Sequence, residues 1–345
     1  MPTPREIYLR RLETVRERLR SVPADGLYAT PSSNLYYLTG IDFHRSERLT
    51  ALFLFPDADP VVVCPAFEEA RLRGMSAVTK VVTWEETEDP WAKAAAIFPS
   101  GAGRLAVEPS TAYDDVERLL RARSGWTPVS AAGLFSALRM VKTPDEIEMM
   151  RRAIAVALPR FRKAFESLRP GALESDISAA FGGENVVQFG PSSALPHGAS
   201  GPTPLAKEQA VLIDAWDKPD GYYYDITRST WFGRPTDEYR KVWSIVLEAQ
   251  GAAIDAAARR VIEKAGYGEY FTHRLGHGLG IDVHEPPYMV GHDKTILEPG
   301  MTFTSEPGIY LPGRFGVRIE DDVVCTERGA ESLSPRVERL EPLTV

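Results

Sequence analysis

The first half of the chain alternates apolar runs with amphipathic stretches. Apolar residues recur at helical spacing among charged ones over residues 4–21, which predicts an amphipathic helix. Short apolar runs then predict strands at 26–30, 49–55, 61–65, 81–84 and 104–109. The strands at 49–55 and 61–65 are expected to form a hairpin. Helices are predicted between or after these runs, at 67–74, from Pro90 onward and at 113–123. Because strands alternate with helices, we expect an α/β domain over residues 1–135.

A strong helix start opens the second half of the chain. Thr143 suits the N-cap, Pro144 suits the first helical position, and Glu146 completes a capping box. We therefore predict a long helix that runs to about Leu168 and is kinked at Pro159.

The rest of the second half mixes strands and helices without regular alternation. Helices are predicted at 175–180 and 236–265, and a pair of strands at 209–216 and 221–233. The remainder is rich in Gly and Pro and is typical of strands and loops. We therefore expect a second domain over residues 143–345, and the family resemblance described below implies that it is an α+β domain.

Composition narrows the classes of function. The formal net charge of the 345 residues is −8, which argues against nucleic acid as a partner. No apolar run approaches membrane-spanning length, and the N-terminus is charged, so neither a membrane span nor a signal sequence is expected. The two cysteines, Cys64 and Cys325, lie far apart and form no disulfide framework. We therefore expect a cytoplasmic protein with no membrane or nucleic-acid partner.

A histidine-rich stretch spans residues 271–287. It holds three of the chain's six histidines, His273, His277 and His284, and glycines surround His277. Neutral imidazole is a common ligand for zinc, manganese, cobalt and nickel. The plain alternative is a surface loop with incidental histidines, but three of six within twelve residues favours metal binding or catalysis.

Four acids interrupt runs that otherwise read as buried strands: Asp214, Asp225, Glu306 and Glu320. Taken singly, each reads as a surface or salt-bridged residue, but a lone buried carboxylate costs several kcal/mol unless it is paired or binds a metal. Asp214 and Asp225 flank one predicted turn, 11 residues apart, and we expect them across from each other on adjacent strands. Four acids with one histidine suit two divalent ions, and oxygen-rich ligation favours manganese, with cobalt or zinc as alternatives.

The order and spacing of several motifs resemble a known family. The motifs are LPHG at 195–198, LID at 212–214, YDITRS at 224–229, GHGLGIDVHE at 276–285, TSEPGIY at 304–310 and GVRIEDD at 316–322. Through them the stretch from Thr143 to Thr326 resembles the pita-bread metallopeptidases, which include methionine aminopeptidase, prolidase and aminopeptidase P. EPGIY followed by GVRIEDD is typical of the proline-specific branch, the M24B type. The first half is similar to that branch's creatinase-type N-terminal domain, through NLYYLTG at 34–40 and ERL at 47–49.

The resemblance implies two metal ions per subunit and five ligands for them. Asp214 would bind one ion, Asp225 and Glu320 would bridge both, and His277 with Glu306 would complete the second. Where the family has a small residue after Asp214 and Ala215, this chain has Trp216. Because the ligand spacing survives, this departure affects the expected shape of the pocket rather than metal binding.

Other residues take roles at the substrate through the same resemblance. His197 and His284 would contact substrate around the scissile bond, with His284 near the carbonyl oxygen. His273 would line the pocket, and Arg318 would hold substrate or orient the acids. Glu306 would also carry the proton from the attacking water to the leaving nitrogen.

The function implied is hydrolysis of the Xaa-Pro bond of proline-containing peptides by an Xaa-Pro dipeptidase (prolidase). The main alternative is aminopeptidase P, which acts on longer peptides. A metal-free creatinase-like hydrolase and a non-enzymatic interaction module are more remote, because both would lack part of the ligand set found here.

A charged loop at 40–49 is a candidate for limiting substrate length. The resemblance implies a homodimer in which the first domain of one subunit reaches the other's active site. Arg45 or Arg48, in a loop that also holds Asp42, would then pair the carboxylate of a dipeptide, because a guanidinium can hold a carboxylate with two hydrogen bonds. The plain alternative is an ordinary solvated loop.

Overall fold

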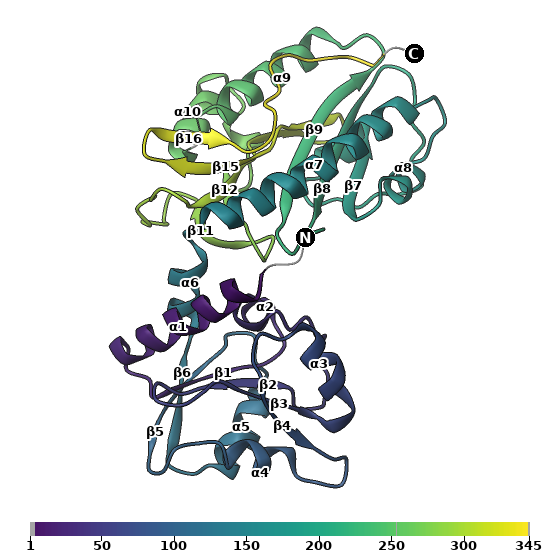
Figure 1. Ribbon diagram of the computed structural model, residues 1–345. Helices are drawn as coiled ribbons and strands as arrows, with labels where there is room; N and C mark the ends of the chain where they lie inside the picture. Colours follow the sequence, from purple (N-terminus) through teal and green to yellow (C-terminus); the bar gives the residue numbers. More distant parts are fainter. Residues whose placement is uncertain (1–3, 253, 344–345) are drawn as a thin grey trace. The chain divides into compact units, whose positions relative to one another are not determined.

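The chain divides into two compact units, Met1–Leu138 and Arg139–Val345 (Figure 1). The computed structural model describes residues 4–252 and 254–343. None of the helices in these ranges combines the length and the apolar character that crossing a membrane requires.

The first unit is built on one mixed sheet with the strand order β4-β3-β2-β1-β5-β6. Its strands are β1 Gly26–Ala29, β2 Ala51–Leu54, β3 Val61–Pro65, β4 Lys80–Trp84, β5 Gly103–Val107 and β6 Trp126–Ser130. The first five confirm the strands predicted from the apolar runs, and the antiparallel pairing of β2 with β3 confirms the hairpin. The pairs β1–β5, β5–β6 and β3–β4 are parallel, as expected for strands joined through helices.

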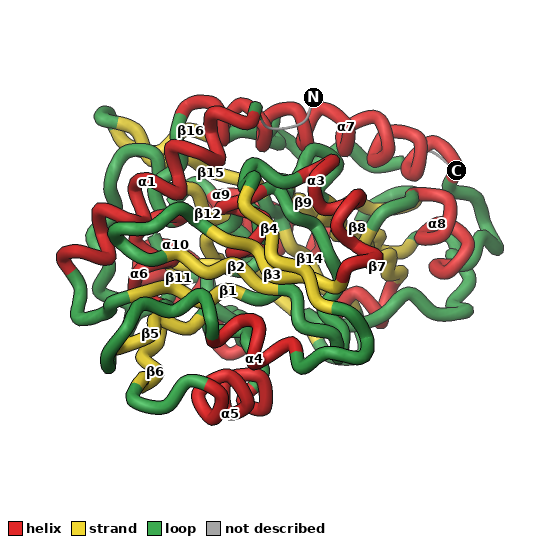
Figure 2. The backbone as a smooth tube through the Cα atoms, turned by 60° about the horizontal axis from the view of Figure 1, so that its bottom comes forward, coloured by secondary structure: helices red, strands yellow, loops and turns green. Residues whose placement is uncertain are grey.

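Helices cover this sheet and close its core. They are α1 Arg5–Ser21, α2 Ser33–Thr39, α3 Glu69–Met75, α4 Pro90–Ala95, α5 Tyr113–Ala122 and α6 Ala132–Arg139. Helices α4 and α5 lie together against one face of the sheet (Figure 2). In the core that these helices share with the sheet, the Phe98 ring packs edge-on against the rings of Trp126 and Phe53, with ring centroids 4.9 and 5.7 Å apart. The unit therefore has an aromatic core of its own.

Three elements of this unit were not predicted: α2, β6 and α6. Helix α2 has seven residues, too few for a helical period to stand out. Strand β6 is an edge strand with exposed positions and with Pro128 inside it, so it shows no apolar run.

The second unit opens with α7, Pro144–Ser167. Its capping box is present as predicted: the Glu146 N–H donates to Thr143 Oγ1 at 3.3 Å, and the Thr143 N–H donates to Glu146 Oε2 at 2.7 Å. Helix α7 runs through Pro159 as one helix and lies beside β8 and β9 (Figure 1). Helix α8, Glu174–Phe181, follows it.

The strands of the second unit form three sheets within the described residues. A three-stranded sheet holds β7 Glu184–Phe189, β8 Gln209–Asp217 and β9 Tyr224–Phe232. A five-stranded sheet, in the order β11-β10-β12-β15-β16, holds β10 Gly276–Gly278, β11 Glu285–Met289, β12 Thr302–Ser305, β15 Asp321–Thr326 and β16 Gly329–Ser332. A ribbon pairs β13 Gly308–Leu311 with β14 Phe315–Arg318. The pair β8–β9 confirms the strands predicted around the 217–220 turn, whereas β7 was not predicted.

The single helix predicted over 236–265 is wrong. The structure has two helices there, α9 Asp237–Gln250 and α10 Asp255–Lys264. Gly251 follows the end of α9, and glycine lowers helix stability because of its large loss of backbone entropy. Ending α9 lets α10 bury its own apolar face, so that Val246 and Ile262 join one core with Phe303.

Candidate active site

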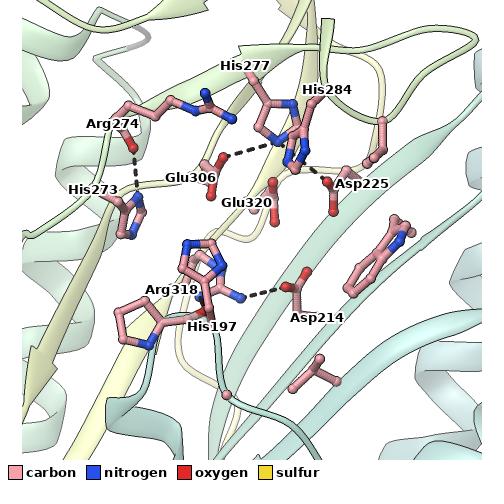
Figure 3. Close-up of a pocket in the computed structure, with 15 residues that line it drawn as sticks. His197, Asp214, Asp225, His273, Arg274, His277, His284, Glu306, Arg318 and Glu320 are labelled. Atoms are coloured by element: carbon pink, nitrogen blue, oxygen red, sulfur yellow. Dashed lines mark hydrogen bonds and ion pairs between the residues drawn. The ribbon is translucent and has the colours of Figure 1, made fainter. Parts of the chain in front are cut away.

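The second unit holds a pocket of about 650 Å³ that gathers residues from strands of all three of its sheets and from the loops between them (Figure 3). Nine residues singled out in the sequence line it: His197, Asp214, Asp225, His273, His277, His284, Glu306, Arg318 and Glu320. Asp214 lies on β8 and Asp225 on β9, whereas His277 lies on the short strand β10. The other six lie at strand ends or in loops, so the sheets act as a frame that points side chains into one space.

The two aspartates are not directly across from each other, as the sequence had led us to expect. Asp214 lies opposite Thr227, and Asp225 lies opposite Trp216. The aspartates are therefore diagonal neighbours, offset by two residues in register. Because residues two apart on a strand point to the same face, both carboxylates still reach the pocket.

Three buried side chains form the closest group of metal-ligating type. Asp225, His277 and Glu320 each offer one ligand atom, and these atoms lie within 4.8 Å of one another. His277 Nε2 lies 3.6 Å from Asp225 Oδ2 and 3.4 Å from Glu306 Oε1. Carboxylate oxygens with an imidazole nitrogen are ligands that manganese, cobalt and zinc accept.

Thr227 and Arg318 connect the fifth residue, Asp214, to this group. Thr227 Oγ1 lies 2.9 Å from Asp214 Oδ1 and 2.6 Å from Glu320 Oε2. Arg318 donates to Asp214 Oδ2 at 2.6 Å, to Thr227 Oγ1 at 2.9 Å and to the Tyr310 hydroxyl at 2.9 Å. Burial lowers the pKa of Arg318. The attraction of Tyr310 and of the neighbouring acids outweighs this effect, so the pKa of Arg318 lies well above its ordinary value. Arg318 is thus a permanent cation that orients Asp214.

The carboxylates repel one another in a site that excludes water. Burial first, and neighbouring carboxylates second, raise the pKa values of Asp225 and Glu320 well above their ordinary range. Burial, together with Asp214 and against Arg318, raises the pKa of Glu306 to about 7. A divalent cation would relieve this repulsion, and the donor set fits one.

His277 is buried and is held neutral, and the pKa of the adjacent His284 is shifted in the same direction. Burial and the neighbouring His284 lower the pKa of His277 to about 3, and the neutral imidazole is the form that binds metal. Burial and Arg274 also lower the pKa of His284, whose ring packs edge-on to His277 with centroids 4.2 Å apart.

The remaining histidines lie on the opposite side of the pocket (Figure 3). The nitrogens of His273 lie 2.7 Å from the Arg274 carbonyl oxygen and 2.9 Å from the Tyr310 hydroxyl, so protein groups occupy both. His197 is exposed on the loop after β7. Gln188, on β7, donates from Nε2 to two carbonyl oxygens of this segment, those of Ser192 and Leu195, at 2.7 and 3.1 Å. The buried Gln188 side chain therefore holds the loop that carries His197.

Reasoning from sequence missed two residues in and around this pocket. Thr227, inside YDITRS, joins two of the acids, and its position two residues after Asp225 is a signal that could have revealed it. Arg274 directly follows His273 and lines the pocket. Its guanidinium lies 4.7 Å from the centre of the Tyr288 ring, and the described parts of the chain provide it with no hydrogen bond or ion pair. Arg274 is thus a cation available to an anionic group in the pocket.

The residues predicted to limit substrate length lie in the first unit. Arg48 Nε lies 2.8 Å from Glu86 Oε1, and the same guanidinium also pairs with Glu47. Arg45 lies 3.7 Å from Asp115, and Asp42 is exposed. Both arginines therefore already face carboxylates of their own unit.

Comparison with known proteins identifies the class of protein that carries this fold and site. Residues 148–327 match metallopeptidase family M24, and residues 11–141 match the creatinase/prolidase N-terminal domain. The chain belongs to family M24 and is a metallopeptidase. This confirms the expected fold class, a creatinase-type α/β domain followed by a pita-bread α+β domain.

Three solved structures are similar along almost their whole length. Dipeptidase PepE from Mycobacterium ulcerans is 35% identical with a TM-score of 0.91, and the match covers 100% of both chains. A dipeptidase from Pyrococcus horikoshii OT3 is 33% identical with a TM-score of 0.90, covering 97% of this chain and 100% of that one. A prolidase from Thermococcus sibiricus is 32% identical with a TM-score of 0.90, covering 98% and 99%.

Proposed function

We propose that this protein is a dinuclear-metal exopeptidase that hydrolyses the Xaa-Pro bond of dipeptides. The observation that carries the proposal is the gathering of four acids around neutral His277 in one pocket, with Asp225, Glu320 and His277 buried and His284 packed beside His277. Relatives named as dipeptidase and prolidase support the choice of substrate.

Five side chains would hold two divalent ions, manganese being the one we expect: Asp214, Asp225, His277, Glu306 and Glu320. When bound, such ions lower the pKa of a water toward about 7 and polarise the scissile carbonyl. Glu306 would accept the proton of that water on a carboxylate oxygen and pass it to the leaving imino nitrogen.

The other pocket residues would bind and orient the peptide. The neutral His284 would donate a ring N–H to the carbonyl oxygen as negative charge develops there. His197 would contact substrate from its exposed loop, and His273 would form part of the wall. Arg318, engaged with Asp214, would act by orienting that acid.

Arg274 is the partner we assign to the carboxylate at the end of a dipeptide. Its stacking on Tyr288 limits the directions that its planar guanidinium can take, and such a fork can hold a carboxylate with two parallel hydrogen bonds. A dipeptide presents this carboxylate one residue from the scissile bond, whereas a longer peptide presents an amide there. Recognition of the carboxylate would therefore favour dipeptidase over aminopeptidase P activity.

The substrate class is tested by comparing turnover of three peptides with added manganese: an Xaa-Pro dipeptide, an Xaa-Pro-Xaa tripeptide and a Met-Xaa dipeptide. We expect the highest kcat/KM for the Xaa-Pro dipeptide, because its proline and its carboxylate would both be recognised. Preference for the tripeptide would assign aminopeptidase P instead, and preference for Met-Xaa would contradict proline specificity.

Recognition of the carboxylate is tested with Arg274→Leu, using an Xaa-Pro dipeptide and its C-terminal amide. We expect the wild-type preference for the free acid to fall by about 10- to 100-fold in the variant, as for the loss of a charge-assisted hydrogen-bonded pair. Turnover of the amide should change little, since it lacks the group that Arg274 would bind.

The earlier candidates, Arg45 and Arg48, provide the comparison. If they act across a homodimer as the family resemblance implies, Arg45→Ala or Arg48→Ala should lower the ratio of dipeptide to tripeptide kcat/KM. Light scattering that shows a monomer would remove that route. An unchanged acid preference in Arg274→Leu would contradict the role of Arg274.

A further inference from the structure

Next to His284 lies a cluster of four charged side chains, the Glu285 ion-pair group: Arg139, Lys142 and Glu285, which are nearly buried, and Asp282, which is partly exposed. Lys142 Nζ donates to Glu285 Oε1 at 2.7 Å. Arg139 Nη2 donates to the other Glu285 oxygen and to Asp282 Oδ2, the latter at 2.7 Å. The side chains of Lys142, Glu285 and Arg139 are only 2%, 6% and 9% exposed. Two cations balance two carboxylates, and water is largely excluded from the cations and from Glu285, whereas Asp282 stays partly exposed.

The group takes no part in the pocket itself. Within residues 4–252 and 254–343, none of its four members lines the catalytic pocket. Because burying charges costs free energy that an apolar core would avoid, a fully paired group of this kind is weak evidence for stability alone. A role in fixing one local conformation is a better explanation, and the conformation that it fixes is the turn that carries His284.

The carboxylates of the group lie on either side of His284 in sequence. Asp282 precedes His284 by two residues, and Glu285 follows it directly. The Asp282 N–H donates to Glu285 Oε2 at 3.4 Å, and the Gly280 N–H donates to the Asp282 carbonyl oxygen at 3.0 Å. A Cβ added at Gly280 would lie 2.7 Å from Glu285 Oε1 and 2.9 Å from Lys142 Cε, so the turn closes tightly on the charges.

The cations of the group come from a part of the chain that is itself fixed. Arg139 and Lys142 precede α7 and lie 143 residues from Asp282 and Glu285, respectively. The Lys142 N–H donates to the Gly300 carbonyl oxygen at 2.9 Å, and Val141 forms a β-bridge with Met301. Strand β12 follows Met301 immediately, so the cations are anchored to the five-stranded sheet.

The His284 ring has little else to direct it. It packs on the ring of His277, and the described residues provide no hydrogen bond to either of its nitrogens. The direction of the ring therefore depends on the backbone of residues 280–285. A side chain that donates a hydrogen bond in catalysis must lie within hydrogen-bond distance of the reacting oxygen. Misplacing such a side chain by 1 Å can lower the rate about a hundredfold.

We propose that the Glu285 ion-pair group is a positioning device for His284, which holds the turn at 280–285 so that the imidazole points at the scissile carbonyl. The inference rests on the proposed role of His284 and adds Glu285, Arg139 and Lys142 to it. These three act through His284 and touch neither metal nor substrate.

The test is a double-mutant cycle between Glu285→Gln and His284→Ala in the full chain. Glu285→Gln keeps the shape of the side chain but removes the charge that both cations pair with. We expect kcat for the Xaa-Pro dipeptide to fall about 10- to 100-fold, with KM and bound metal nearly unchanged. In the His284→Ala background the same change should cause no further loss, because the residue that it positions is gone.

Matched variants separate positioning from general destabilisation. Arg139→Lys keeps the charge but not the fork that reaches both carboxylates, so kcat should lie between wild type and Glu285→Gln. Arg151 on α7 forms an exposed ion pair, 2.7 Å long, with Glu331 on β16, and Arg151→Met, which breaks it, should leave kcat unchanged. If Glu285→Gln does not fold, as judged by thermal unfolding, Arg139→Lys is combined with His284→Ala instead.

Two kinetic results would overturn the proposal: independent, multiplicative losses in the double variant, or a kcat at the wild-type level in Glu285→Gln. Loss of bound metal in Glu285→Gln would also do so, because the group would then act on the metal ligands. A wild-type kcat in His284→Ala alone would instead contradict the proposed role of His284.

Discussion

Glu320→Gln is expected to abolish peptidase activity. Glu320 is buried, and one of its carboxylate oxygens lies within 4.8 Å of ligand atoms of Asp225 and His277. The hydroxyl of Thr227 joins Glu320 to Asp214. An amide keeps the size of the side chain but not its charge or its capacity to bridge two cations. Because loss of a group that merely supports a ligand costs about 10- to 100-fold, loss of the ligand should exceed the upper figure. The same result is expected for Asp225→Asn.

Metal binding gives this prediction a readout that does not depend on turnover. Purified protein is stripped with a chelator and then titrated with manganese, while metal content and the thermal midpoint are measured. The wild type should take up two equivalents and unfold at a higher temperature, because an ion that binds the folded state stabilises it. Both responses should be reduced in Glu320→Gln. Glu327→Gln, at an exposed acid beyond β15, is the matched control. Retention of most activity by both ligand variants in excess metal would rule out the dinuclear site.

His284→Ala is expected to lower kcat by about a hundredfold or more, which is typical of losing one hydrogen-bond donor to a developing oxyanion. Partial desolvation and Arg274 lower the pKa of His284, which favours the neutral imidazole, the form that keeps one N–H to donate and one nitrogen to accept. KM should change less than kcat, because the interaction strengthens in the transition state.

Metal content distinguishes this role from ligation. Bound manganese in His284→Ala should equal that of the wild type, whereas His277→Ala should lose metal. His292→Ala, at an exposed histidine in the loop after β11, controls for removing an imidazole elsewhere. Metal loss in His284→Ala would show that the roles of the two histidines are assigned wrongly.

Local signals in the sequence were sufficient for much of the fold. Apolar runs predicted β1 to β5, and the Thr143 capping box predicted the start of α7, since both depend on residues close together in the chain. The errors occurred where tertiary contacts decide. Gly251 could be accommodated in one long helix or end a shorter one, and the packing of α10 on the core selects the second.

The sequence by itself determined which residue types could do the chemistry. Nine residues named from motifs and spacing line one pocket, because acids that interrupt apolar runs must find a partner when the fold buries them. Only the tertiary structure decided how they are arranged. The register of β8 and β9 makes Asp214 and Asp225 diagonal, and Thr227 and Arg318 join Asp214 to the other acids.

The structure alone also revealed Arg274 as a cation in the pocket and the group that holds the turn of His284. Arg139 and Glu285 are 146 residues apart, and no local pattern predicts that they meet. Spacing along the chain reflects backbone geometry over a few turns or one hairpin, whereas contacts of this kind depend on how separate strands and helices pack. Packing is a property of the whole fold, and this is why the candidate ligands could be named from their motifs, whereas Arg274 and the Glu285 ion-pair group could not.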